Sequence, residues 1–88
     1  MPTVKIPISE LSETASVFFT YSKEISQAIA NIEKRMASLQ SNWEDASRQP
    51  FFQSYKVWDK DAHGVAESLS LLAREMEAIA KRYEDINT

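Results

Sequence analysis

The chain reads FFQSYKVWDKDAHGVAESLSLLAREMEAIAKRYEDI from Phe51 to Ile86, and this stretch decides the fold. Alternating steps of three and four residues through it meet no polar residue. The residues met are Phe51, Tyr55, Trp58, Ala62, Val65, Leu69, Leu72, Met76, Ile79, Tyr83 and Ile86. A mean step of about 3.5 residues places all of these side chains on one face of a helix. We therefore predict one long amphipathic helix over this half of the chain.

The first half of the chain carries the same pattern, interrupted by one polar residue. The steps meet Ile8, Leu11, Ala15, Phe18, Ser22, Ile25, Ile29, Ile32, Met36, Leu39 and Trp43. Ser9 is the expected N-cap, because its hydroxyl can accept a hydrogen bond from an unpaired backbone N–H. Pro2 and Pro7 disfavour helix at the residues that precede them. We predict an extended arm over residues 1–8 and a first helix over residues 9–41.

The two halves are separated by the sequence SNWEDASRQP at residues 41–50. Asn42, Asp45 and Ser47 favour caps and turns, and Pro50 is tolerated only in a first helical turn. We predict a turn over residues 42–47 and a second helix over residues 48–86. Two Asp residues and the only Gly make residues 59–64 the weakest part of this helix, where a bend or local fraying is expected.

A connection this short makes the two helices antiparallel neighbours. We predict one all-α domain over residues 1–88, folded as an antiparallel two-helix hairpin. The apolar stripe is wider than a single seam requires, which is typical of a bundle helix. Two hairpins are therefore expected to dimerise into a four-helix bundle, as a homodimer or as a heterodimer with a related hairpin. The predicted dimer interface consists of Phe18, Ile25, Ile29, Ile32, Trp58, Val65, Leu69, Leu72 and Met76.

Composition argues against several classes of protein. The chain has no Cys, which removes disulfides and thiolate chemistry, and its net charge of -3 is spread without a basic face for nucleic acid. No apolar run approaches the roughly 18–20 residues of a membrane span, and no secretory signal peptide is evident.

Reactive side chains are equally sparse, so neither an enzyme nor a cofactor-binding protein is expected. No set of Ser, His and acidic residues suggests a catalytic site that a hairpin could assemble. Asp59 and His63, four residues apart, supply only two metal ligands where three or four are needed. We therefore expect no metal site, and we interpret His63 as a solvated helix residue.

The mid-chain sequence carries a family resemblance. The segment LQSNW ends the first helix at residues 39–43, and it is followed by Ala46, Phe51, Tyr55, Trp58 and the apolar ladder from Leu69 to Tyr83. This resembles the WXG family, the early-secreted-antigen-like small proteins of bacterial type VII secretion. The resemblance covers the whole chain and implies helical hairpins that dimerise. It also implies export from the bacterial cytoplasm by a membrane-bound ATPase without a cleaved signal peptide, partnership with larger secreted toxins, and an association with virulence.

The chain departs from the family pattern at two places. The family reads Trp-x-Gly at the turn, whereas this chain reads Trp43-Glu44-Asp45; Asp caps helices and tolerates left-handed backbone, so the hairpin should form with a differently shaped turn. The family's export signal is Tyr-x-x-x-Asp/Glu, and here Asn87 follows Tyr83 at that spacing. Because Asn lacks the charge, a heterodimer whose partner carries the signal is favoured.

Two interpretations stay open for the turn and for the C-terminal tail. Trp43 either packs the turn or, with Glu44 and Asp45, is read by a partner; Tyr83 either continues the apolar stripe or is the core of the export signal. The predicted function is a small protein of a type VII secretion system, exported as a dimer or acting as a partner or adaptor for a secreted effector. The alternative is a structural helical oligomerisation module with no link to secretion.

Overall fold

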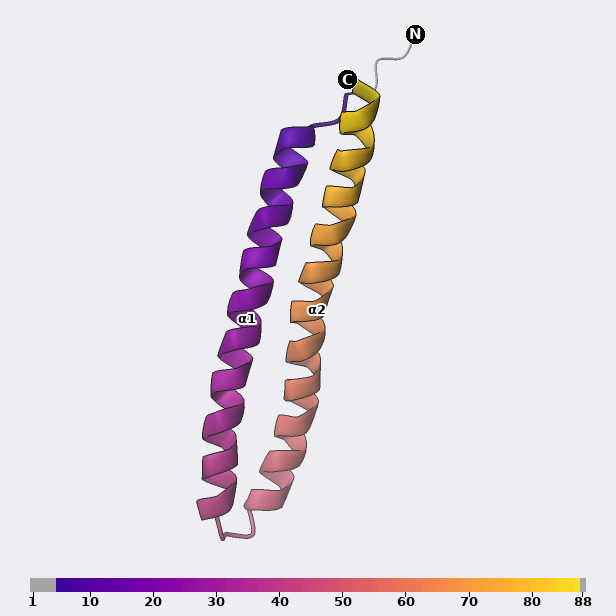
Figure 1. The fold of residues 1–88 in the computed structure, drawn as a ribbon. Coiled ribbons are helices and arrows are strands. Elements are labelled where there is room, and N and C mark those ends of the chain that lie inside the picture. Colours follow the sequence, from indigo (N-terminus) through magenta and orange to yellow (C-terminus); the bar gives the residue numbers. More distant parts are fainter. Residues whose placement is uncertain (1–4, 88) are drawn as a thin grey trace.

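The protein is a hairpin of two long antiparallel helices, as predicted. The computed structural model describes the backbone of residues 5–87 and the side chains of residues 5–84. Helix α1 spans Ile8–Asn42 and helix α2 spans Arg48–Asn87 (Figure 1). Together they form a rod with extents of 70 × 19 × 13 Å, in which α1 begins and α2 ends at the same end. Residues 1–4 of the predicted arm lie outside the described part of the chain.

Helix α1 begins one residue earlier than predicted, and Ser9 is not its cap. Pro7 occupies the N-cap position without a side-chain hydrogen bond, and its carbonyl accepts the N–H of Leu11 at 2.9 Å. The N–H of Ile8 is bonded to the carbonyl of Ile6 at 2.8 Å. Because proline already holds φ near helical values, the helix can start directly after Pro7, and Ser9 falls inside the first turn.

Helix α2 is continuous over 40 residues, Arg48–Asn87. Pro50 is its third residue, where the missing N–H costs no intrahelical hydrogen bond. The helix also continues without interruption through residues 59–64, so the predicted weak point does not break it. Tertiary packing along the rest of the seam outweighs the low helix propensity of a few residues.

The seam between the helices is made chiefly of small side chains on α2. The most buried residues are Ala15 and Ile29 of α1, and Phe52, Ala66, Ala73 and Ala80 of α2. The α2 positions follow a seven-residue spacing, in which Asp59 fills the remaining place between Phe52 and Ala66. Alanine has no side-chain entropy to lose and lets two helix backbones approach closely.

One polar residue of the α1 stripe is explained by this seam. The Ser22 hydroxyl donates a 2.8 Å hydrogen bond to the backbone carbonyl of Ala66 on α2. Because the hydroxyl is satisfied, a polar group at a seam position carries no penalty for an unpaired donor. The bond also fixes the axial register of the two helices at mid-rod.

Candidate functional site

A row of exposed apolar side chains runs along α2. Its members recur at intervals of seven residues: Phe51, Trp58, Val65, Leu72 and Ile79. The row lies roughly 100° around α2 from the seam, because these positions precede seam positions by one residue. The α2 stripe identified in the sequence therefore runs beside the seam and not inside it.

Helix α1 contributes to the same open surface. The α1 seam positions continue the seven-residue series Ala15, Ser22, Ile29 and half-buried Met36. Each is followed three residues later by an exposed or half-buried apolar residue, namely Phe18, Ile25, Ile32 and Leu39. In α2, Tyr55, Leu69 and Met76 have the same three-residue offset and are half-buried. In an antiparallel pair, equal offsets from the seam place residues on the same edge. These residues and the exposed row together form one continuous surface, which we call the apolar face.

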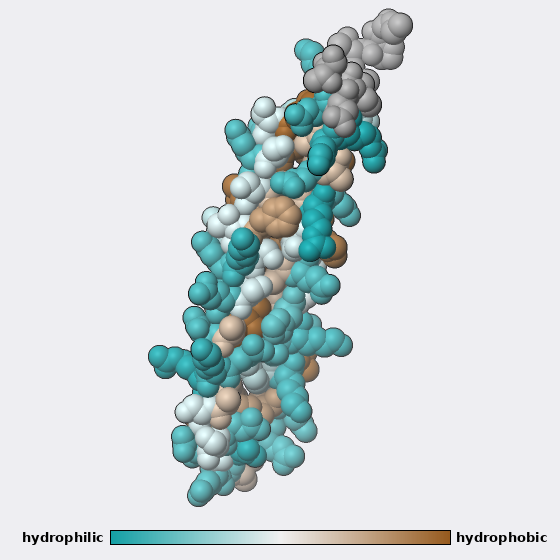
Figure 2. Space-filling view, viewed as in Figure 1, coloured by the Kyte–Doolittle hydropathy of each residue, from teal (hydrophilic) through white to brown (hydrophobic). Residues whose placement is uncertain are grey.

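The predicted interface residues divide between this face and the seam. Ile32, Trp58, Val65 and Leu72 are exposed on the apolar face, whereas Phe18, Ile25, Leu69 and Met76 are half-buried where it meets the seam. Ile29 is 2% exposed and is already covered within its own chain. By contrast, Figure 2 shows a face of the hairpin that is mostly hydrophilic, with only isolated hydrophobic spots.

The turn between the helices is organised by Asp45. Its carboxylate accepts hydrogen bonds from the Ser47 hydroxyl at 2.7 Å and the Ala46 N–H at 2.8 Å, and its carbonyl accepts the Arg48 N–H at 3.1 Å. The Ser47 hydroxyl, followed by the Ala46 N–H, lowers the pKa of Asp45. None of the described non-glycine residues has a positive φ. This turn therefore needs no left-handed residue, and Asp45 takes the place of the family's Gly by bonding the backbone that leads into α2.

Trp43 packs the turn against the beginning of α2. Its ring centroid lies 5.2 Å from that of Phe51 and 5.7 Å from that of Phe52, both within the range of favourable aromatic contacts. The chain of rings continues through Tyr55 to Trp58, which stack at 6.0 Å. Trp43 is half-buried, so its packing role is clear, while Phe51 and Trp58 carry the aromatic surface onto the apolar face.

Arg48 joins this aromatic cluster to the end of α1. Its guanidinium carbon lies 5.9 Å from the centre of the Phe52 ring, and its Nε donates to the carbonyl of Gln40 at 3.1 Å. That carbonyl belongs to the last turn of α1, where backbone acceptors have no helical partner. The turn end of the rod is thus held by ring packing, a cation–π contact and a helix-end hydrogen bond.

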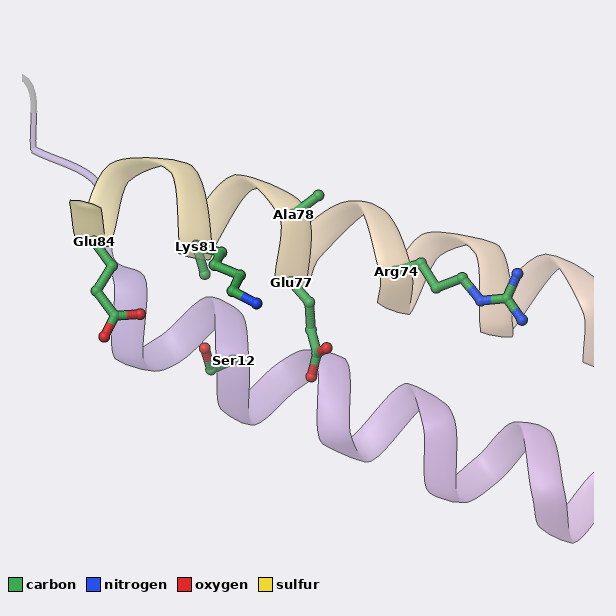
Figure 3. A pocket seen from close by; sticks show the side chains of 7 residues that line it. Ser12, Arg74, Glu77, Ala78, Lys81 and Glu84 are labelled. Atoms are coloured by element: carbon green, nitrogen blue, oxygen red, sulfur yellow. The ribbon is translucent and has the colours of Figure 1, made fainter. Parts of the chain in front are cut away.

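The opposite end of the rod carries the tail residues. Tyr83 is half-buried near the end of α2; Asn87 is the last residue of that helix, and its side chain lies outside the described set. Nearby, a shallow groove lies between the helices, where Glu77, Lys81 and Glu84 reach from α2 toward Ser12 of α1 (Figure 3). Its charges are mixed, which does not favour a strongly anionic or cationic small ligand.

A third cluster lies on the edge of the seam away from the apolar face. Glu33 and His63 each follow a seam position by four residues, and His63 Nε2 lies 3.1 Å from Glu33 Oε2. The same nitrogen lies 3.7 Å from Asp59 Oδ2, while Asp59 Oδ1 accepts the Tyr55 hydroxyl at 3.3 Å. The hydrogen bond between Glu33 and His63 lowers the pKa of Glu33 and raises that of His63.

Sequence reasoning counted two possible metal ligands here, and the structure supplies a third, Glu33. It was missed because it is 30 residues from His63 in the chain. Assigning the seven-residue register to both helices would have found it, since Glu33 follows Ile29 by the same four residues that separate His63 from Asp59. His63 is accordingly a paired residue as well as an exposed one.

A family model described as "Proteins of 100 residues with WXG" matches residues 3–88. The chain belongs to the WXG100 family. This confirms the resemblance drawn from LQSNW and the aromatic residues that follow it. No curated protein gives a match to the chain.

Membership of the WXG100 family places the protein among the small, non-enzymatic helical proteins of type VII secretion. Proteins of this family are secreted by type VII systems and typically form dimers. In the described part of this WXG100 chain, neither helix contains a stretch that is both long enough and apolar enough to cross a membrane.

Proposed function

We propose that this WXG100 hairpin works as one half of a four-helix bundle, assembled through the apolar face, and that the bundle is the form handled by a type VII secretion system. The observation that carries the proposal is the row Phe51, Trp58, Val65, Leu72 and Ile79, exposed along nearly the whole of α2. Each large apolar side chain left in water forgoes roughly 1.5–3 kcal/mol of burial energy. Five in a row are costly for a domain whose total stability is of the order of 5–15 kcal/mol.

The shape of this surface favours a second helical hairpin as its occupant. The row keeps a seven-residue spacing, which matches the ridges of another long helix. Half-buried Phe18, Ile25, Leu69 and Met76 border it and widen the contact to both helices. In the assembled form the protein is exported as a dimer or acts as the partner of a secreted effector with a similar helical segment.

Val65 and Val57 provide a matched pair of variants for testing this assembly. Both are more than half exposed on α2, but Val65 belongs to the exposed row and Val57 lies on the side of the helix away from α1. Val65→Asp should reduce the mass of the assembly in solution and reduce secretion from a bacterium with an active type VII system. Val57→Asp should change neither the mass of the assembly nor secretion, because the new carboxylate is exposed to water both in the single hairpin and in the assembly.

The same pair separates secretion from a purely structural role. If Val65→Asp disrupts assembly while the wild-type chain is never released by the type VII system, the chain is a structural oligomerisation module. If Val65→Asp leaves both assembly and secretion intact, the apolar face is not the contact surface and the proposal fails.

The tail and the turn are proposed as the parts that the secretion machinery or the effector reads. Tyr83 stands at the family's signal position, and Trp43, Glu44 and Asp45 form the opposite end of the rod. Tyr83→Ala should lower secretion or effector capture in a chain whose helical circular dichroism is unchanged. Val57→Ala is the control, since Val57 is exposed on the side of α2 away from α1 and from the apolar face. Equal secretion of the two variants would remove the tail tyrosine from the mechanism.

A further inference from the structure

We propose that Glu33, Asp59 and His63 form a binding site for a divalent transition-metal ion of the zinc type, which links α1 to α2. The site is independent of dimer assembly, because it lies on the edge of the seam away from the apolar face. A second hairpin docked on that face leaves it accessible. Family membership assigns no metal to this chain, so the inference depends only on the geometry and chemistry of these three residues.

The ligand atoms already lie at distances that suit a metal ion. With Zn–N and Zn–O bonds of about 2.0–2.1 Å, two ligands of a tetrahedral site are roughly 3.4 Å apart. His63 Nε2 lies 3.1 Å from Glu33 Oε2 and 3.7 Å from Asp59 Oδ2, and all three ligand atoms fall within 4.8 Å of one another. Small side-chain rotations therefore suffice to enclose an ion, without movement of either helix.

The position of Asp59 is difficult to explain by helix packing alone. It occupies the seam series that otherwise holds Phe52, Ala66, Ala73 and Ala80, and its side chain is only 25% exposed. A partly buried carboxylate costs free energy unless it is paired, and alanine satisfies the packing elsewhere in this series. The Tyr55 hydroxyl holds Oδ1 of Asp59, which leaves Oδ2 turned toward His63. Carboxylate ligands of metal ions are commonly oriented in this way, by a hydrogen bond from a residue that does not itself contact the metal.

The local charge also favours a cation. Two carboxylates face one imidazole, so the cluster stays negative even when His63 is protonated. Within residues 5–84, no Lys or Arg forms an ion pair with an acidic side chain, and the only pairs are those of His63 with Glu33 and Asp59. A divalent ion would neutralise both carboxylates and replace the proton on Nε2, which is the atom that donates to Glu33 in the metal-free state.

The ligand set indicates which metal ions fit. One imidazole nitrogen with two carboxylate oxygens suits zinc and its neighbours among the borderline divalent ions, whereas calcium and magnesium prefer oxygen alone. The side chains of Glu33 and His63 are 41% and 53% exposed, so water can complete the coordination. Because Glu33 comes from α1 and the other two ligands come from α2, the bound ion fastens the two helices together at mid-rod.

The test is a zinc titration of the whole chain after treatment with a chelator. Calorimetry at about pH 7.5, above the usual pKa of a free histidine, should show one zinc ion per chain. Thermal unfolding should shift to higher temperature as zinc chloride is added, because the ion binds only the folded arrangement. His63→Gln should abolish both effects, and Glu33→Gln should abolish the thermal shift by removing the ligand from α1.

Two further variants sharpen the test. Tyr55→Phe should weaken zinc binding by about tenfold, the usual effect of losing an outer-shell hydrogen bond. Glu77→Gln is the matched control, since Glu77 is an exposed acid four residues after Ala73, on the same edge as His63. It should bind zinc as the wild type does.

Three results would overturn the proposal. These are an absence of zinc binding by the wild type at millimolar zinc, binding that survives His63→Gln, and binding that Glu33→Gln and Glu77→Gln weaken equally. Circular dichroism of each variant shows whether it remains helical. Because dimer mass is measured separately, failure of the metal site leaves the proposed assembly unaffected.

Discussion

Leu72 and Leu71 offer a direct measure of what the apolar face contributes to assembly. They are adjacent residues of one type with nearly equal exposure, 46% and 50%, but only Leu72 belongs to the exposed row. Burying a whole leucine side chain yields about 1.5–3 kcal/mol, so covering the 46% of Leu72 that is still exposed yields about 0.7–1.4 kcal/mol. In a symmetric dimer the residue counts twice, which gives about 1.4–2.8 kcal/mol.

Leu72→Ala should therefore raise the dissociation constant of a homodimer by roughly 10- to 100-fold. If the partner is a different hairpin, only one copy is lost and the increase should be about 3- to 10-fold. Leu71→Ala should change it by less than about twofold, because its side chain points away from α1 and from the apolar face. Sedimentation equilibrium, or calorimetric titration with the partner, gives both values. Equal weakening by the two variants would refute the assignment of the face.

Three further predictions concern the single hairpin. Ser22→Ala should destabilise it by about 0.5–1.5 kcal/mol through loss of the bond to the Ala66 carbonyl, measured by urea unfolding, whereas Ser54→Ala, whose hydroxyl bonds within its own helix, should have a smaller effect. Gly64→Ala should stabilise it by about 0.5–1 kcal/mol, because a Cβ there meets nothing within 4 Å; a lower melting temperature would contradict this. Glu33 raises the pKa of His63, so in chelator this pair stabilises the fold fully only where Glu33 is ionised and the pH is below about 6.5, and the stabilisation disappears as pH rises through the raised folded value of His63. His63→Gln should flatten that part of the pH–stability curve, and an unchanged slope would show that the pair does not contribute.

The helical hairpin could be predicted from the sequence because its apolar pattern follows a helical period over both halves. The predicted helix boundaries lie within one residue of the observed ones. The N-cap was wrongly assigned to Ser9 because Pro7 allows α1 to start one residue earlier. A period locates the apolar arc of a helix, but it does not say which part of the arc meets the neighbouring helix. That choice depended on backbone approach, and the small residues Ala66, Ala73 and Ala80 allowed the closest contact.

The sites were less predictable for the same reason. The departure at Asp45 suggested a reshaped turn, and the hydrogen bonds to Ala46 and Ser47 show how a carboxylate organises it without left-handed backbone. The contact of Glu33 with His63 required the register between two helices, which Ser22 and Ala66 help to set in the folded hairpin. The sequence pattern predicts where each residue lies on its own helix. Only the packing of α1 against α2 shows that Glu33, Asp59 and His63 lie close together.

The start of α1 and the end of α2 lie together at one extremity of the 70 Å rod, and this arrangement affects how partners can bind the protein. Whatever grips the last turn of α2 stands a full molecular length from whatever touches Trp43. Two partners that bind these opposite ends can therefore occupy the same hairpin at the same time. In a compact protein of the same mass the two binding surfaces would lie close together, and the two partners would compete.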